Sequence, residues 1–243
     1  MWSGEEINPA VYIPANGMLF SVQHRFAQNY TVLANYTWSH CISQLDFTGE
    51  LTGSKYQISG NRGADRGDCN FDYRHVANVS VVVQSAGLRS GWVRGLTKDW
   101  RLAPIVQMRS GAPLTVTTGS DASLTGVGLD RPNVVDPSAV VPENQSVASW
   151  LHRVAFANNA PGTYGNSGRD AYRGPSYVNL DFALSRIFSI REGWQLEVRG
   201  ESFNALNHAN LKAPNVNLSS SNFGIIPTAE DPRILQFGMK FRF

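Results

Sequence analysis

The two cysteines carry the clearest chemistry in this chain. Cys41 and Cys69 are its only cysteines, and they bracket a loop at the ends of two successive predicted strands. Two thiols placed in this way can form a disulfide in an oxidising compartment; the alternative is a pair of unrelated free thiols. A zinc site is disfavoured because zinc in proteins takes four well-spaced ligands. We therefore expect a disulfide between Cys41 and Cys69.

Three carboxylates lie inside this loop or directly after it. Asp65, Asp68 and Asp72 could supply the oxygen ligands that calcium prefers. Their spacing does not fit the EF-hand template, and segments rich in Asp and Gly are far more common as turns. We therefore predict turns here and no metal or other cofactor.

The sequence contains the residue types of two kinds of catalytic site, but their motifs and spacing do not support either. Ser39, His40 and Asp46 contain the residue types of a triad, but no Gly-x-Ser-x-Gly motif places a serine on a strained turn. Glu197 and Glu201 share one strand face about 13 Å apart, which is too far for the carboxylate pair of a glycoside hydrolase. We do not expect an enzyme.

The overall composition limits the class of protein. The chain has 243 residues, which is long enough for one large all-β domain or two small ones. Its net charge of +2 gives no reason to expect nucleic acid as a partner. Charged residues make up 16%, below the roughly 25% usual for soluble domains. No run of about 18 apolar residues occurs, which excludes a membrane-spanning helix.

The acidic start, MWSGEEINPAVYIP, lacks the apolar core of a signal peptide. Alone these features favour a cytoplasmic protein; with the strands below they favour a truncated one.

The elements that must position these residues are strands, and the last is the clearest. Ile234 to Phe243 alternates strictly, because successive side chains of a strand point to opposite faces. Its apolar face consists of Leu235, Phe237, Met239, Phe241 and Phe243. A soluble sheet could use this pattern, but bacterial outer-membrane barrels repeat it, with apolar residues toward lipid and polar residues toward the lumen.

Six further segments alternate in the same way. We therefore predict an all-β fold, an antiparallel up-and-down meander of seven strands. The other predicted strands are Met18 to Phe26, Tyr30 to His40, Tyr73 to Ser85, Trp100 to Arg109, Tyr177 to Phe188 and Trp194 to Phe203. Pro104 cannot donate to a strand ladder, so we expect its strand to be bulged or locally broken. Tyr73 is assigned to the apolar face of its strand.

The polar strand faces carry more charge than the interior of a sandwich could hold. These charged residues are Arg25, Arg74, Asp181, Glu197, Arg199, Glu201, Lys240 and Arg242. A water-filled lumen accounts for them. A one-residue slip would move Lys240 and Arg242 into lipid at roughly 2 to 4 kcal/mol each near the midplane, so the register should be strongly fixed.

Short and long connections alternate along the chain. Residues 27–29, 86–99 and 189–193 are short links, whereas 41–72, 110–176 and 204–233 are long and rich in Gly, Asn, Ser and Pro. Outer-membrane barrels show this asymmetry between periplasmic turns and extracellular loops. Seven is an odd strand number and an open sheet exposes two edges. We therefore expect the C-terminal segment of a larger transmembrane barrel, with residues 1–17 as a partial outer loop or strand.

Several patches, in order and spacing, resemble one known family. They are NYTWSH at 35–40, NFDYRH at 70–75, RSGAPLTV at 109–116, GRDAYRGPSYVNLDFALSRIF at 168–188, RGESFNALNHANLKAP at 199–214 and FGIIPTAEDPRILQFGMKFRF at 223–243. Together they resemble the C-terminal barrel of TonB-dependent receptors, specifically the Oar-like outer-membrane transporters. The resemblance spans residues 18–243. It implies a barrel of about 22 strands plugged by an N-terminal domain, of which this chain would hold seven or eight strands.

The resemblance also implies a function and its partners. It implies TonB-dependent uptake of a large nutrient at the cell outer membrane, with the substrate unidentified. The partners would be outer-membrane lipid, the barrel-assembly machinery, which would recognise the last strand ending in Phe243, and the energy-coupling TonB complex. That complex would act through a plug that this chain lacks.

Three smaller groups of residues acquire roles in this setting. Asp72, Arg74 and His75 match a family patch, and we interpret them as an ion-paired anchor where the loop re-enters the barrel. The patch containing Phe203, Asn204, Asn207 and His208 is expected to shape a loop, with contact to a substrate as the alternative. Aromatic girdles at the membrane interfaces would explain Trp38, Trp100, Trp194, Tyr30, Tyr36, Tyr73 and Tyr177; cross-strand packing in a soluble sheet is the alternative.

Two other classes of protein remain open. One is a small self-closing outer-membrane pore or adhesin, which needs an eighth strand within Glu5 to Pro14 or Leu114 to Thr118 that pairs with the last strand. The other is a soluble carbohydrate-binding β-sandwich, in which the apolar faces would meet in a closed, dry interior.

Overall fold

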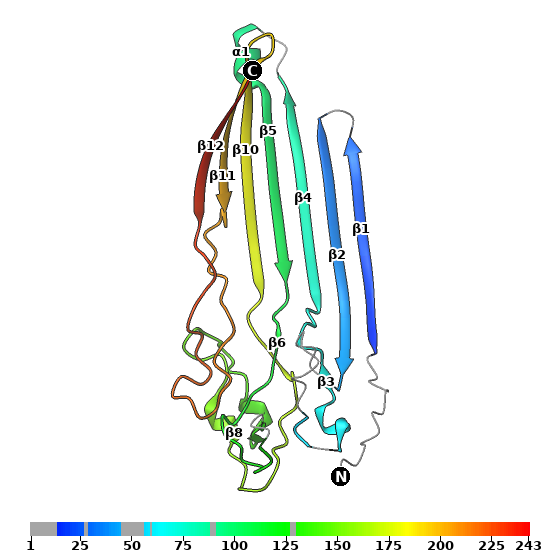
Figure 1. Ribbon diagram of the computed structural model, residues 1–243, viewed down its shortest axis with the longest axis vertical. Coiled ribbons are helices and arrows are strands. Elements are labelled where there is room, and N and C mark those ends of the chain that lie inside the picture. Colours follow the sequence, from blue (N-terminus) through cyan, green and yellow to red (C-terminus); the bar gives the residue numbers. More distant parts are fainter. Residues whose placement is uncertain (1–13, 27–28, 45–55, 59, 88–90, 127–129) are drawn as a thin grey trace, which may run out of the picture.

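One antiparallel sheet dominates the computed structural model, which describes residues 14–26, 29–44, 56–58, 60–87, 91–126 and 130–243. Its long strands are β1 (Ala15–Phe26), β2 (Tyr30–Ser43), β4 (His75–Ala86), β5 (Lys98–Arg109), β10 (Tyr177–Arg191), β11 (Trp194–Phe203) and β12 (Ile234–Arg242). They lie side by side in chain order, from β1 at one edge to β12 at the other (Figure 1). The predicted all-β meander and all seven of its strands are confirmed.

The strand register gathers most of the apolar strand residues on one face of the sheet. A single row across five strands pairs Val22 with Ala34, Ala34 with Val79, Val79 with Val106 and Val106 with Leu180. Directly opposed residues point to the same side of a sheet, so one side of the sheet carries a continuous apolar row. This side is uncovered at its edge, where Phe237 is 82% and Met239 78% exposed. Within the described residues these side chains do not meet in a closed interior.

Two local predictions were wrong. Pro104 neither breaks nor bulges β5, which pairs with β10 without a register shift. In the ladder between β4 and β5 the pairing is interrupted around Pro104. The register shift of that ladder lies at another place, between Gln84 and Ala86 of β4. Tyr73 precedes β4 instead of starting it. Its ring lies against Arg109, which belongs to the polar face, so Tyr73 does not extend the apolar one.

The sheet has two unlike ends. At the turn end, residues 27–29, 87–97 and 192–193 link neighbouring strands, and the second link contains the short helix α1 (Gly91–Thr97), which the sequence did not predict. At the loop end lie the described residues of the segments 44–74, 110–176 and 204–233. Figure 1 places the C-terminus at the turn end. Among the described helices, none has the length and apolar character needed to cross a membrane.

The loop end folds into a cap with its own apolar core. Its short elements are β3 (Gly67–Asp68), β6 (Pro113–Leu114), β7 (Asn133–Val134), β8 (Phe156–Ala157), β9 (Tyr172–Arg173) and the 3₁₀ turns Arg62–Asp65, Pro137–Ala139 and Arg153–Ala155. The core contains Val116, Val140, Leu151, Ala155, Phe156, Leu218 and Phe223. It joins two long loops, since Leu218 donates to the Thr117 carbonyl at 2.8 Å and Trp150 to that of Gly224 at 2.7 Å.

Gly224 is required at this junction. Its φ is +77°, and a Cβ there would lie 2.1 Å from the Leu151 carbonyl oxygen. Only glycine tolerates both the left-handed backbone and this close approach.

The two edge strands run in the same direction. Six successive antiparallel pairings separate β1 from β12, and an even number of reversals restores the starting direction. The proposed eighth strand at Leu114 to Thr118 does not pair with β12: Leu114 pairs with Tyr172 and Thr117 bridges to Asn217. Of the other candidate, Glu5 to Pro14, only Pro14 lies within the described residues.

Candidate functional site

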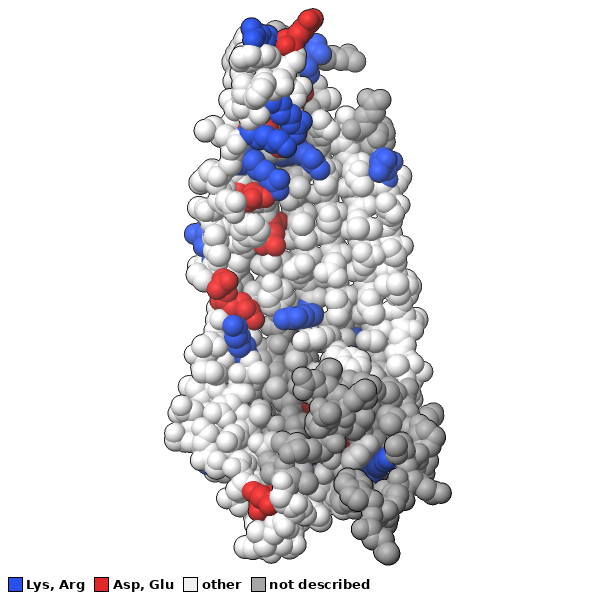
Figure 2. Space-filling model, in the orientation of Figure 1, with Lys and Arg blue, Asp and Glu red and all other residues white. Residues whose placement is uncertain are grey.

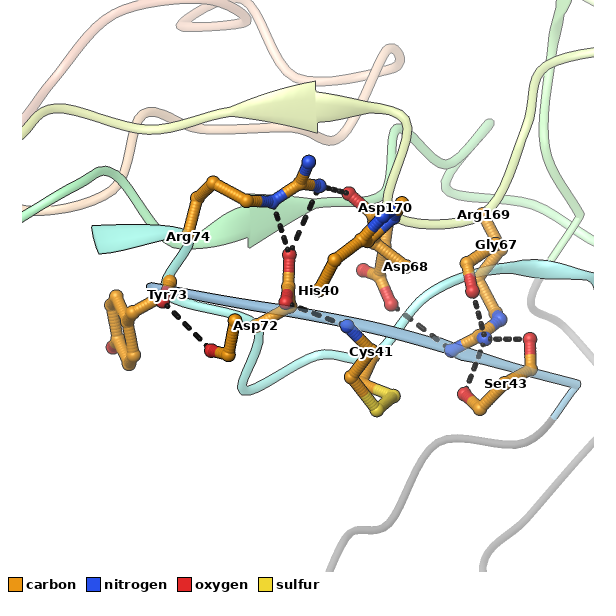
Figure 3. Close-up of a disulfide and its surroundings, with 12 residues drawn as sticks. His40, Cys41, Ser43, Gly67, Asp68, Asp72, Tyr73, Arg74, Arg169 and Asp170 are labelled. Atoms are coloured by element: carbon orange, nitrogen blue, oxygen red, sulfur yellow. Dashed lines mark hydrogen bonds and ion pairs between the residues drawn. A yellow bond between two sulfur atoms is a disulfide. The ribbon is translucent and has the colours of Figure 1, made fainter. Parts of the chain in front are cut away.

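The disulfide ties the first long loop to the end of β2 (Figure 3). β3 pairs with β2 through Ile42 and Asp68, which brings Cys69 beside Cys41. Their Cα atoms are 5.4 Å apart, and the Cys69 amide donates to the Cys41 carbonyl at 3.0 Å. Both cysteines are buried. The loop is therefore fastened at its return to the sheet.

Asp72 anchors the same point electrostatically. Its Oδ1 accepts a hydrogen bond from the Cys41 amide at 2.9 Å, and its Oδ2 accepts from Arg173 at 2.7 Å and from Arg74 at 3.2 Å. Burial raises the pKa of this carboxyl and is the largest single effect. The Arg173 and Cys41 hydrogen bonds and the charges of Arg173 and Arg74 together outweigh burial, so the pKa lies below its usual 3.8.

The other loop carboxylates are also paired with cations. Asp68 accepts from His40 at 3.1 Å and from Arg74 at 3.3 Å, and it also pairs with Arg173. Asp65 is buried against Arg131. The side chains considered as calcium ligands thus bind arginine and histidine, and they join residues 56–74 to the loop 110–176.

Arg169 provides a second link between these loops. It donates to the Ser43 carbonyl at 2.6 Å and to the Asp65 carbonyl at 2.7 Å, and it pairs with Asp170 at 3.0 Å. Arg169 is 5% exposed, so its charge is satisfied within the protein. The sequence did not single out Arg169 or Arg131; only their places in Gly-Arg-Asp and Asp-Arg-Pro runs hinted at ion pairs.

The described residues of the catalytic constellations considered above have other partners. Ser39 donates to the Tyr73 carbonyl at 3.4 Å, while His40 is turned to Asp68. Asp46 lies outside the described residues. Glu197 pairs with Arg242 and Glu201 with Arg199, all on the polar strand face.

A cavity of about 670 Å³ opens where the polar face meets the cap. It is lined by Val76, Asn78, Gln107, Met108, Arg109, Tyr177, Asn179, Asp181, Phe203, Asn204, Asn210, Glu230, Asp231, Pro232 and Ile234. β4, β5 and β10 supply the amide side chains of Asn78, Gln107 and Asn179, and the loop 204–233 supplies those of Asn204 and Asn210. The volume lies in the range of small-molecule sites.

Asparagines hold the wall of this cavity in place. Asn204 has a φ of 47°. Its backbone amide donates to the Asp181 carboxylate at 3.0 Å, and its side-chain amide donates to the His208 carbonyl at 2.9 Å. Asn207 accepts from the Arg233 amide at 3.0 Å. The patch from Phe203 to His208 therefore shapes the loop, as expected. The sequence did not single out Asn210. Its side chain accepts a hydrogen bond from the Val178 amide and donates one to the Val178 carbonyl, both at 2.8 Å.

The aromatic residues separate into two groups. Trp38, Trp100, Trp194, Tyr30 and Tyr36 occupy the register positions of the apolar face. Tyr73 and Tyr177 instead hold Arg109 between their rings, with its guanidinium carbon 5.0 and 4.7 Å from the two ring centres. These two tyrosines are therefore not part of a lipid-facing girdle.

The last strand forms a free edge of the sheet. Its apolar side chains Leu235, Phe237, Met239, Phe241 and Phe243 are 44–91% exposed. Phe241 packs edge-to-face on Trp194, with ring centres 5.3 Å apart. The role of these residues as an assembly signal stays a prediction.

A comparison with protein families identifies the class of this chain. The family model for an outer membrane beta barrel domain matches residues 8–236, which include all of β1 to β11. No curated protein matches the chain. Proteins of this family are typically porins, transporters or adhesins and not enzymes. The protein is located in the cell outer membrane. Its two-faced meander and this match over most of its length show that the chain belongs to the outer membrane beta barrel domain family.

Proposed function

We propose that this chain forms the C-terminal part of the barrel wall of a TonB-dependent transporter that takes up a large nutrient. The observation that carries the proposal is the parallel direction of the two edge strands, β1 and β12. Bacterial outer-membrane barrels close with even numbers of antiparallel strands. The seven described long strands cannot close on themselves in that way, and further strands would complete the wall.

The folded cap also supports a receptor. Two of the long loops share an apolar core. Two arginines buried in the loop 110–176, Arg131 and Arg169, bind the loop after β2 through Asp65. A cavity lies directly beneath the cap on the polar face. A simple pore needs no such folded cover, whereas a receptor needs rigid loops to position a ligand.

The proposed partners follow from the two faces and the last strand. The apolar face would contact outer-membrane lipid, and the polar face would line the lumen. The barrel-assembly machinery would recognise the strand that ends in Phe243. The energy-coupling TonB complex would act through a plug domain outside this chain. We propose residues 18–243 as the barrel segment, with Ala15–Gly17 continuing β1 toward the cap.

The test is whether the 243-residue chain closes alone. The chain would be expressed with a bacterial secretion signal, and the outer-membrane fraction examined for a protease-resistant band whose gel mobility changes on heating. We expect no such band, because unpaired strand edges are not tolerated in a bilayer. A resistant, heat-modifiable monomer would contradict the proposal and support a small self-closing pore or adhesin. The soluble sandwich is no longer a candidate, because the apolar face is uncovered and the family is a membrane one.

A further inference from the structure

A row of carboxamide side chains crosses the polar face of the sheet. Asn35 is directly opposite Asn78, Asn78 opposite Gln107, and Gln107 opposite Asn179. Opposed residues point to the same side, so β2, β4, β5 and β10 each contribute one amide to this amide row. Ser21 of β1 extends it, because its hydroxyl donates to Asn35 at 2.7 Å. With strands about 4.8 Å apart, the five positions span roughly 19 Å.

The middle of the amide row is free to bind a ligand. Asn78 and Gln107 are exposed, and neither side chain makes a hydrogen bond to any described residue. Each carboxamide offers two donors and an acceptor. Asn179 at the end is buried and donates to Asp181 at 2.9 Å. Asn78, Gln107 and Asn179 all line the cavity of about 670 Å³, so the row leads directly into it.

Apolar residues border the amide row on both sides. Toward the cap, the neighbouring row consists of Leu19, Thr37, Val76, Arg109 and Tyr177. Toward the turn end, it consists of Gln23, Leu33, Ser80, Ile105 and Asp181. A line of hydrogen-bonding groups between two partly apolar lines matches a sugar chain, whose hydroxyl edges are polar and whose ring faces carry C–H groups.

Charge narrows the class of ligand further. Figure 2 shows no Lys, Arg, Asp or Glu over the middle of β1, β2 and β4. In the cavity, Asp181, Glu230 and Asp231 outnumber Arg109, whose guanidinium lies between two tyrosine rings. An anionic ligand would therefore be repelled.

We propose that the amide row and the adjoining cavity form a binding track for a neutral oligosaccharide. The track rests on the proposed function in one respect, that the polar face lines a lumen. A peptide fits less well, because extended peptides are usually bound at a free strand edge through main-chain hydrogen bonds. β2, β4, β5 and β10 are paired on both sides, so their backbone groups are already used.

The test measures binding of defined probes to the whole protein purified in detergent. Calorimetry would compare three neutral hexasaccharides, cellohexaose, maltohexaose and xylohexaose, with an anionic hexagalacturonate and a neutral Gly-Ser hexapeptide. The key variant is Asn78→Ala with Gln107→Ala, which removes no side-chain hydrogen bond within the described part of the chain. Its matched control is Gln84→Ala, on the same face of β4 but about 20 Å nearer the turn end.

We expect at least one neutral hexasaccharide to bind, the double variant to weaken that binding about tenfold or more, and Gln84→Ala to leave it unchanged. Binding of none of the three sugars, tighter binding of the anionic sugar or the peptide, or an unaffected double variant would overturn the inference. Outer-membrane insertion measured in the same preparations separates the two proposals. A protein that inserts but binds no neutral sugar refutes only the track, whereas a wall that closes alone refutes the transporter.

Discussion

Asp72 shows how a single buried carboxylate can join three segments. One oxygen accepts the amide of Cys41 in β2, and the other accepts guanidinium groups from Arg74 before β4 and Arg173 in β9. Hydrogen bonds between charged groups are about twice as strong as neutral ones. Loss of this one charge should therefore loosen the attachment of the cap to the sheet.

Lowering the pH should reduce the stability of the cap, because Asp72 becomes protonated. Because the folded-state pKa is lowered below 3.8, the carboxylate stabilises the fold above that value, and the contribution is lost as the pH falls through the lowered pKa. Asp72→Asn should cost about 1.5 to 3 kcal/mol at neutral pH and should flatten the loss of stability in acid. Thermal unfolding in detergent over a series of pH values would measure both effects.

The control for Asp72 is Glu143→Gln, an exposed carboxylate of the cap without an ion pair among the described residues. It should leave the unfolding temperature unchanged. An Asp72→Asn variant with the acid sensitivity of the parent would show that other groups control the cap.

The disulfide should stabilise the same junction. Its cysteines are separated by 28 residues, for which the loop-entropy estimate is on the order of 3 to 4 kcal/mol. Cys41→Ser combined with Cys69→Ser should lower the unfolding temperature and speed proteolysis between these positions. Maleimide labelling of the denatured parent should require prior reduction; labelling without reductant would show that the two thiols are free.

At the scale of elements, the strands were predictable and their surroundings were not. Period-two alternation identifies β12 or β2 from local sequence alone, because one face must be apolar. The exceptions are local. Tyr73 precedes β4 and its ring lies against Arg109, and Pro104 fits within β5 where only the ladder to β4 is interrupted. The amide row depends on strand register, which no single strand reveals.

The last strand should direct assembly of the barrel. β12 presents its apolar side chains at a free edge, and Phe243 is 91% exposed beyond it. Deleting Phe243 in the whole protein should reduce its amount in the outer membrane, because the terminal aromatic group would be missing from the strand that the assembly machinery recognises. Phe243→Tyr keeps an aromatic ring and should assemble normally. Equal outer-membrane levels of all three proteins would refute this role.

At the scale of the molecule, apolar residues occur in two places for two reasons. The compact core lies in the cap, where Val116, Leu151 and Phe156 are buried together, and the strands carry their apolar side chains outward. The cap core was not predictable, because it joins residues far apart in the sequence without a periodic pattern. The outward face was predictable, since charges such as Lys240 and Arg242 had to face water.

The outward face can be tested with two neighbouring residues of β4. Val81 lies opposite Val32 on the apolar face, and Ser80 lies opposite Leu33 on the polar face. Val81→Lys should cost roughly 2 to 4 kcal/mol if its side chain meets hydrocarbon near the midplane, and Ser80→Lys should cost little in a wet lumen. Because the two positions share strand, depth and substitution, the difference isolates the face. Urea unfolding from lipid vesicles would measure it, and equal stability of the two variants would refute lipid contact on this side.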